Sequence, residues 1–224
     1  MKKHTFLPRV SAGLAFVAVA LIGSPSAKAD VFTSWSSFLS RLQGGYYFED
    51  LSRFPAGYLS SPQDFSGGTP AFTYTVSYAV THPEMPDHGL YVVETPGYGK
   101  SLSVVENSDN IHVSFTSGNV TAVGGYFFMT DYGGNVTGGT VTVRLSDGST
   151  ARLYSPNDPA GLFRGFISTV PITSLDIQGA EDPSPNAPYV TVSSLTVGVP
   201  EPGTLALAAL GLLTLGVWRW RCSK

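Results

Sequence analysis

Hydrophobic and polar residues alternate with a period of two along much of the chain after residue 71. Turn-forming segments rich in Gly, Asn, Asp and Ser, such as 117–119, 133–135 and 146–149, separate the runs. Strands of this kind bury one face and expose the other, as in antiparallel sheets. The pattern predicts an all-β fold, an antiparallel, jelly-roll-like β-sandwich of about eight to ten strands. The apolar positions of its clearest runs are Ile111, Val113 and Phe115; Val141, Val143 and Leu145; Leu175 and Ile177; and Val190, Val192 and Leu195.

A helical period appears before the sandwich. Apolar residues recur there at three- and four-residue spacing, which predicts a short helix that Thr33 or Ser34 can cap. We expect this helix to pack on the sandwich as a lid. Residues 30–70 are therefore interpreted as a helix and loop lead-in, and residues 71–198 as the sandwich. The apolar positions of the helix are Phe32, Trp35, Phe38, Leu39 and Leu42.

The first 29 residues have the three parts of a secretory signal peptide. Lys2, Lys3 and Arg9 precede an apolar stretch over residues 10–23. Ala27-Lys28-Ala29 then supplies small residues at the cleavage positions. We expect cleavage after Ala29 and export of the rest of the chain.

A second apolar segment lies near the C-terminus. Residues 205–217 are apolar except for Thr214, and tryptophans stand at 218 and 220. The segment approaches the roughly 17–25 residues that a membrane-spanning helix needs, and tryptophan suits the membrane interface. We predict a span over residues 204–220. A basic tail over 219–224 would act as a stop signal on the cytoplasmic side: Arg219, Arg221 and Lys224.

Pro200-Glu201-Pro202 precedes this span. The two prolines lack backbone donors and disfavour helix, so the tripeptide should be extended and open to a processing enzyme. Motif, span and basic end together resemble the PEP-CTERM sorting signal of Gram-negative bacteria, which would occupy residues 199–224. The resemblance implies that an exosortase, an integral-membrane peptidase, recognises Pro200, Glu201 and Pro202. It further implies export through the inner membrane, a membrane-anchored precursor, and a final place at the cell surface or outside the cell.

Several strand segments also resemble the body of many PEP-CTERM proteins. In that group the last strand commonly reads Asp-Asn-Leu, as in calcium- and carbohydrate-binding sandwiches. This chain has Ser193-Ser194-Leu195 instead.

The net charge of the exported part restricts the classes of partner that it can bind. Residues 30–202 hold six Lys and Arg and all 16 Asp and Glu of the chain, a net charge of −10. Nucleic acid is excluded as a partner, because the phosphate backbone requires a basic surface. Cations or neutral polysaccharide fit better. Cys222, the only cysteine, lies in the tail, so the body has no disulfide.

Two groups of residues are candidates for a site. His82, Glu84, Asp87 and His88 could ligate a transition metal, although their spacing is not standard and a solvated loop is the favoured interpretation. Among the aromatic residues, Tyr126 and Tyr132 could stack on sugar rings, although aromatic residues at alternating positions are more often core.

No nucleophile elbow or triad spacing occurs, and no cofactor is expected. Carboxylates for glycoside hydrolysis can be paired only in space, so they stay open as an alternative. The nearest candidates are Glu49, Asp50, Glu84, Glu94 and Asp131.

Taken together, the sequence predicts an exported, non-enzymatic surface or extracellular-matrix protein. It would be sorted and cleaved near Pro-Glu-Pro, with exopolysaccharide as a candidate ligand. The alternatives are a secreted hydrolase acting on polysaccharide or polyester, and a plain single-pass membrane-anchored protein.

Overall fold

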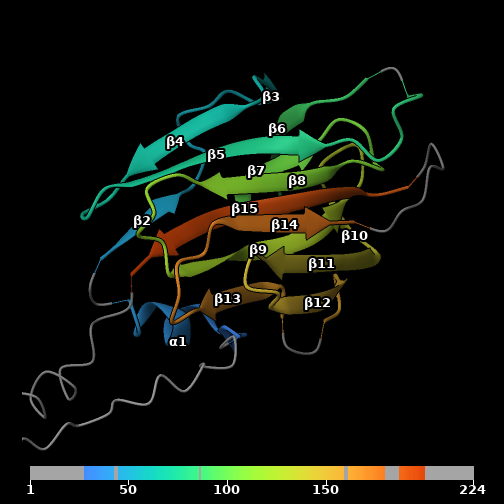
Figure 1. The fold of residues 1–224 in the computed structure, drawn as a ribbon. Coiled ribbons are helices and arrows are strands. Elements are labelled where there is room, and N and C mark those ends of the chain that lie inside the picture. The colour runs from blue at the N-terminus through green and yellow to red at the C-terminus, as the bar shows by residue number, and fades with distance from the viewer. Residues whose placement is uncertain (1–27, 43–44, 86, 159–160, 180–186, 200–224) are drawn as a thin grey trace, which may run out of the picture.

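The computed structural model describes residues 28–42, 45–85, 87–158, 161–179 and 187–199 of the 224-residue chain. Every strand pair in this part is antiparallel, and the strands form two sheets that pack face to face (Figure 1). The antiparallel sandwich predicted from the sequence is confirmed, while its jelly-roll-like connectivity stays a prediction. Within the described ranges there is one helix, the five-residue α1 (Trp35–Leu39).

Sheet A contains nine strands and sheet B six. The path of sheet A is β1 (Asp30–Phe32), β13 (Phe163–Ile167), β9 (Ala122–Thr130), β15 (Tyr189–Gly198), β7 (Gly99–Val104), β6 (Leu90–Thr95) and β3 (Gly57–Leu59), with β2 (Tyr46–Glu49) paired to β15 and β10 (Val136–Thr137) paired to β9. The order in sheet B is β12 (Thr150–Ser155), β11 (Gly139–Leu145), β14 (Ser174–Gln178), β8 (Asn110–Phe115), β5 (Phe72–Ala79) and β4 (Gln63–Gly67).

The core lies between the two sheets and follows the period-two pattern. All the apolar positions that the sequence assigned to the inner face are buried, among them Ile111, Val143 and Val192. His112 alternates with these residues on β8 and lies on the outer face of sheet B, where its Nδ1 is 2.6 Å from Oδ1 of Asp176. The hydrophobic effect therefore sets which face of each strand turns inward.

Helix α1 covers part of the outer face of sheet A, as predicted. The Ser34 side chain caps it by accepting a hydrogen bond from the Ser37 amide at 3.4 Å. Phe38 is fully buried and lies directly over Gly165, where an added Cβ would come within 2.5 Å of the Phe38 ring. This glycine lets the helix approach the sheet closely, so α1 seals a small second core.

Residues 30–70 differ from the predicted helix and loop lead-in. Besides α1 they supply β1, β2 and β3 to sheet A and β4 to sheet B. The boundary at residue 71 is therefore wrong as the start of the sandwich. These strands are three to five residues long, too short to display a clear period in the sequence.

Strand β15 is the central strand of sheet A and the longest in the described part of the chain, with ten residues. One edge pairs with β9 from Tyr189 to Gly198. The other edge pairs first with β7, over Thr191–Ser193, and then with β2, over Leu195–Gly198. The register shifts between Ser193 and Thr196, and Ser194 there adopts a left-handed backbone conformation with φ 57°. This bulge lets one strand change partners without losing its pairing to β9.

We predict that Ser194 tolerates Asn but not a β-branched residue. Ser194→Val should lower the free energy of unfolding by about 1–3 kcal/mol, because valine is strained at positive φ. Ser194→Asn should leave it equal or raise it slightly, because Asn is enriched in left-handed backbone. Urea denaturation measures both, with Ser66→Val at an exposed position of β4 as the matched control. Equal losses for the two valine variants would contradict the role of the bulge.

Candidate functional site

An open groove lies on the outer face of sheet A, at the end where β9 finishes and β15 begins. Its hollow, counted together with the solvent at its open mouth, measures about 650 Å³. Four of its lining residues are tyrosines, so we name it the tyrosine groove. The lining residues that matter below are Tyr58, Tyr91, Tyr132 and Tyr189, with Ser103, Thr130 and Asp131.

The tyrosines come from four separate parts of the chain. Tyr58 on β3 and Tyr91 on β6 are register partners, and their rings meet edge to face with centroids 5.5 Å apart. Tyr132 follows β9 and is 92% exposed, whereas Tyr189 opens β15 and is half-buried. Exposed apolar surface that gathers in one patch often marks a binding site, so this hollow is the leading candidate for one.

A ladder of hydroxyl groups forms the floor of the groove. The Oγ1 atoms of Thr130 and Thr191 are 2.8 Å apart, and Thr191 also donates to Oγ of Ser103 at 3.1 Å. Ser103 in turn donates to the carbonyl oxygen of Val190 at 3.2 Å. All three side chains are buried although they point away from the main core. The hydrogen bonds fix their positions, so the floor is rigid and polar.

Contacts within the loop after β9 fix the backbone on both sides of Tyr132. Asp131 accepts a hydrogen bond from the Asn135 amide at 2.9 Å. Hydrogen bonds from Asn135 hold the pKa of the Asp131 carboxyl below its ordinary value, so it is ionised at neutral pH. Gly134, with φ 81°, approaches β6 so closely that a Cβ would lie 2.5 Å from Val93. The loop is therefore pinned to sheet A.

This arrangement suits a ligand that is a ring with apolar faces and polar edges. Tyrosine rings offer flat apolar surfaces with a polar tip. Burial, followed by the nearby Glu106 carboxylate, raises the pKa of Tyr189, so its hydroxyl keeps its proton at physiological pH. Hydroxyls that can donate and accept, together with one carboxylate, can match the hydroxyl groups around such a ring.

The structure separates the two aromatic candidates. Tyr132 lines the groove, but Tyr126 lies further along β9 and packs against Trp35, Tyr98 and Phe163. The other groove tyrosines were missed. The outward direction of two of them could be predicted from the sequence, because Tyr91 stands between Leu90 and Val92 and Tyr189 precedes Val190. Leu90, Val92 and Val190 face the core, so the alternation places both tyrosines on the outer face.

The four metal candidates do not form one cluster. Nδ1 of His82 is 3.0 Å from Oε1 of Glu84, whereas Nδ1 of His88 is 2.8 Å from Oδ2 of Asp109. His88 also stacks on Tyr78, and Asp87 is exposed. Across the described residues, no three His, Cys, Asp or Glu side chains are grouped to hold a metal ion.

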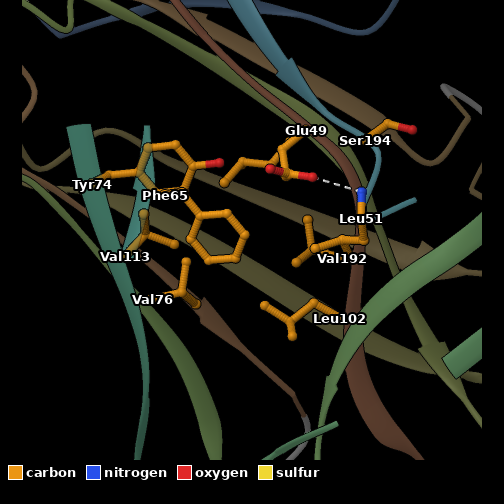
Figure 2. A pocket seen from close by; sticks show the side chains of 10 residues that line it. Glu49, Leu51, Phe65, Tyr74, Val76, Leu102, Val113, Val192 and Ser194 are labelled. Atoms are coloured by element: carbon orange, nitrogen blue, oxygen red, sulfur yellow. Dashed lines mark hydrogen bonds between the residues drawn. The ribbon is translucent and has the colours of Figure 1, made fainter. Parts of the chain in front are cut away.

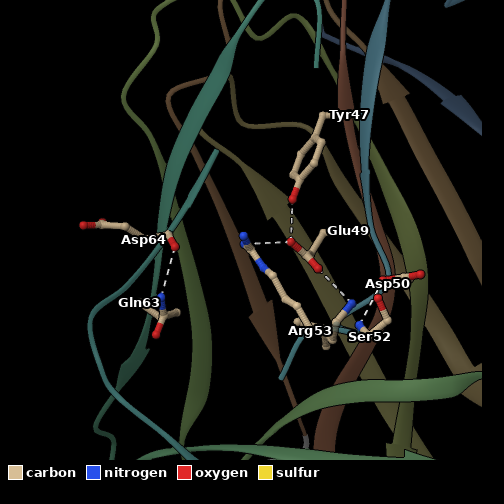
Figure 3. Close-up of polar contacts among 8 residues, drawn as sticks. Tyr47, Glu49, Asp50, Ser52, Arg53, Gln63 and Asp64 are labelled. Carbon is tan, nitrogen blue, oxygen red and sulfur yellow. Dashed lines mark hydrogen bonds and ion pairs between the residues drawn. The ribbon is translucent and has the colours of Figure 1, made fainter. Parts of the chain in front are cut away.

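A second polar cluster surrounds Glu49, one of the candidate carboxylates (Figure 3). Its Oε2 accepts hydrogen bonds from Tyr47 at 2.5 Å and from Arg53 at 2.9 Å, and its Oε1 accepts one from the Leu51 amide at 2.8 Å. Glu49 is 5% exposed. With both oxygens occupied, this buried carboxylate is a structural group that fixes the turn after β2.

Glu49 also borders a small cavity between the sheets (Figure 2). The cavity walls are mostly apolar, including Phe65, Val113 and Val192. The Tyr74 hydroxyl points toward Glu49 in Figure 2, is buried, and finds no hydrogen-bond partner among the described residues. Burial raises the pKa of Tyr74 well above its ordinary value, and the Glu49 charge adds to this.

Comparison with known proteins identifies a PEP-CTERM protein-sorting motif at residues 198–221. It begins at Gly198, the last residue of β15, and contains Pro200, Glu201 and Pro202. The motif indicates an exported protein that an exosortase processes, with a place at the cell surface or outside the cell. No curated protein and no solved structure matches the chain.

The remaining predicted targeting features lie outside the described residues. These are Pro200, Glu201 and Pro202, the span over 204–220, the basic residues Arg219, Arg221 and Lys224, and the first 27 residues of the signal peptide. Among the helices of the described residues, none has the length and apolar character to cross a membrane. The signal peptide and the span stay predictions.

The Glu49 cluster predicts a pH dependence of stability. Burial and the hydrogen bond to Glu49 raise the pKa of Tyr47 to about 12. An unfolded tyrosine ionises near pH 10. Its contribution is therefore fully present below pH 10 and is lost as pH rises to about 12, because the unfolded state releases its proton first. Denaturation midpoints over this window should fall less steeply for Tyr47→Phe than for the control Tyr154→Phe. Identical slopes would contradict the assignment.

Proposed function

We propose that this protein is a non-enzymatic surface or matrix protein whose tyrosine groove binds a neutral extracellular polysaccharide. The observation that carries the proposal is the groove itself, four tyrosines over a fixed hydroxyl floor. Sorting by the C-terminal motif delivers the protein, and the groove gives it a ligand at its destination.

The chemistry of a sugar chain matches the groove on both counts. A pyranose ring has an apolar face of C–H groups that can stack on tyrosine, and hydroxyls at its edge that pair with polar groups. Tyr58 and Tyr132 are exposed enough to meet such a ring, and the exposed Asp131 carboxylate can accept hydrogen bonds from its hydroxyls. The net charge of −10 over residues 30–202 disfavours an anionic polymer.

The position of the groove supports attachment at one end and binding at the other. Tyr189, at the groove, begins β15, and Gly198, where the sorting motif starts, ends it. Ten residues of strand extend about 30 Å. Residues Thr130 and Ala122 at the two ends of β9 pair with these same positions. A chain held at its tail would therefore present the groove away from the membrane.

A binding role fits the groove better than hydrolysis does. Canonical glycoside hydrolysis uses two carboxyl groups about 5–10 Å apart, one of them protonated. Asp131 is the carboxylate among the lining residues of the groove, and its pKa is lowered rather than raised. Glu49 and Asp50 lie elsewhere, and Glu49 is already engaged by Arg53.

Affinity gel electrophoresis tests the binding proposal. Soluble neutral glucans in the gel should retard the protein, and Tyr132→Ala and Tyr91→Ala should each weaken the apparent affinity by roughly tenfold, about 1.4 kcal/mol. Tyr154→Ala is the matched control, since this exposed tyrosine lies on β12 in sheet B. Equal retardation of all variants, or none of the wild type, would overturn the role of the groove. Reducing ends appearing in the same mixtures would favour the hydrolase.

Intact-mass measurement tests the processing step. We expect the released form to lack the tail after the Pro-Glu-Pro motif, and Glu201→Ala to retain a mass that includes Trp218–Lys224. Glu106→Ala, a carboxylate in the body, should be processed normally. A wild-type protein that keeps its tail in both the cell-associated and the released fractions would leave the plain membrane anchor.

A further inference from the structure

One end of sheet A gathers the described N-terminal strand and the exit of the chain toward its tail. A single row of register partners crosses the sheet there, in the order Asp30, Ile167, Ala122, Gly198 and Tyr46. Neighbouring strands are about 4.8 Å apart, so Asp30 and Gly198 are separated by roughly 15 Å. We name this end the exit rim.

The chain is held by the fold right up to the exit. The Val199 amide donates to the carbonyl oxygen of Gly45 at 3.1 Å, and the Thr121 amide donates to that of Gly198 at 3.2 Å. Only residues 200–204 then separate the sandwich from the apolar run that begins at Leu205. Fully extended, the chain from Val199 to Leu205 reaches about 22 Å at most, and any bend brings the rim closer.

Exposed apolar side chains are concentrated at this rim. Nine large hydrophobic residues are exposed in the described part of the chain, and four of them lie here, between 39% and 49% exposed. Three more line the tyrosine groove, which leaves Val80 and Tyr154 elsewhere. Val170 belongs to the loop whose Ser168 and Ile172 amides donate to Thr121 and Val120, beside the exit. The four rim residues are Val31, Tyr46, Phe48 and Val170.

We propose that the exit rim rests on the lipid interface of the membrane that holds the precursor by its tail. The short connection to the tail identifies the membrane surface as the partner of the rim. It keeps the rim within about 22 Å of Leu205, where the apolar run predicted to enter the bilayer begins. Tyrosine and phenylalanine suit the interface, where apolar bodies and polar tips are both accommodated. Four charged residues lie at or beside the rim, two of each sign: Asp30 within the row, Lys28 shortly before it, Asp147, which accepts a hydrogen bond from the Ala29 amide, and Arg41 beside Leu42, which packs on Gly198. The rim is thus close to neutral despite the acidic body.

This inference rests on the proposed membrane-held precursor, and one experiment separates the two. The full chain with its tail, in a Cys222→Ser background, is labelled with an environment-sensitive fluorophore at Tyr46→Cys or Phe48→Cys. Tyr132→Cys in the groove and Tyr154→Cys on β12 are the matched controls. Each protein is reconstituted into vesicles of phosphatidylethanolamine and phosphatidylglycerol, and flotation is measured alongside fluorescence. Circular dichroism and thermal unfolding of each labelled variant confirm that the fold is retained.

We expect all variants to float with the vesicles. Labels at positions 46 and 48 should show a blue shift and be quenched by headgroup-labelled lipids, whereas labels at 132 and 154 should show neither. Flotation with equal quenching at all four positions, or with none, would overturn the rim contact and leave the anchor intact. Failure to float would overturn the membrane-held precursor and the rim contact together, without bearing on polysaccharide binding by the groove.

Discussion

The pairing of β15 on both of its edges is the constraint on which sheet A depends. Its full length is matched by β9, whereas no single strand covers its other edge, where β7 and β2 pair in succession. A bulge at Ser194 reconciles the two registers. The left-handed residue is strained, and the hydrogen bonds of two ladders hold it there. Asn tolerates this left-handed conformation better than Ser.

Strand β15 also runs from the tyrosine groove to the exit rim. Thr191, the third residue of β15, joins the hydroxyl ladder beneath the tyrosine groove, and Gly198 at the end of the strand pairs with Tyr46 on the exit rim. The polar floor can be buried outside the main core because each hydroxyl has a partner. A distortion at one end of β15 would therefore also shift residues further along this continuous strand. The proposed ligand groove and the start of the sorting motif therefore lie at the two ends of one strand.

The sequence predicted those features that depend on local pattern. Alternation identified the inner faces of β8, β11 and β14, and the cap and apolar spacing identified α1. Strands β1 to β4 were missed, because three to five residues cannot establish a period. The groove could be found only in part, since Tyr58 and Tyr132 are brought together by long-range pairing. His82 and His88 show the opposite case, because they are close in the sequence but do not form one site. His82 contacts Glu84, whereas His88 contacts Asp109.

The order of the chain also limits when the fold can be completed. Strand β2 lies near the start of the exported body, yet its partner β15 is the last strand before the sorting motif. Pairing β2 with β15 closes a long loop and costs conformational entropy. Only the contacts of the completed sheet offset this cost. Because β15 ends two residues before Pro200, the final strand must dock while the tail is close behind it. Glu49, held by Arg53 and the Leu51 amide, fixes the end of β2 where this strand pairs with Leu195 of β15. The hydrogen bonds of this buried carboxylate thus hold together the end of β2 and the turn that follows it.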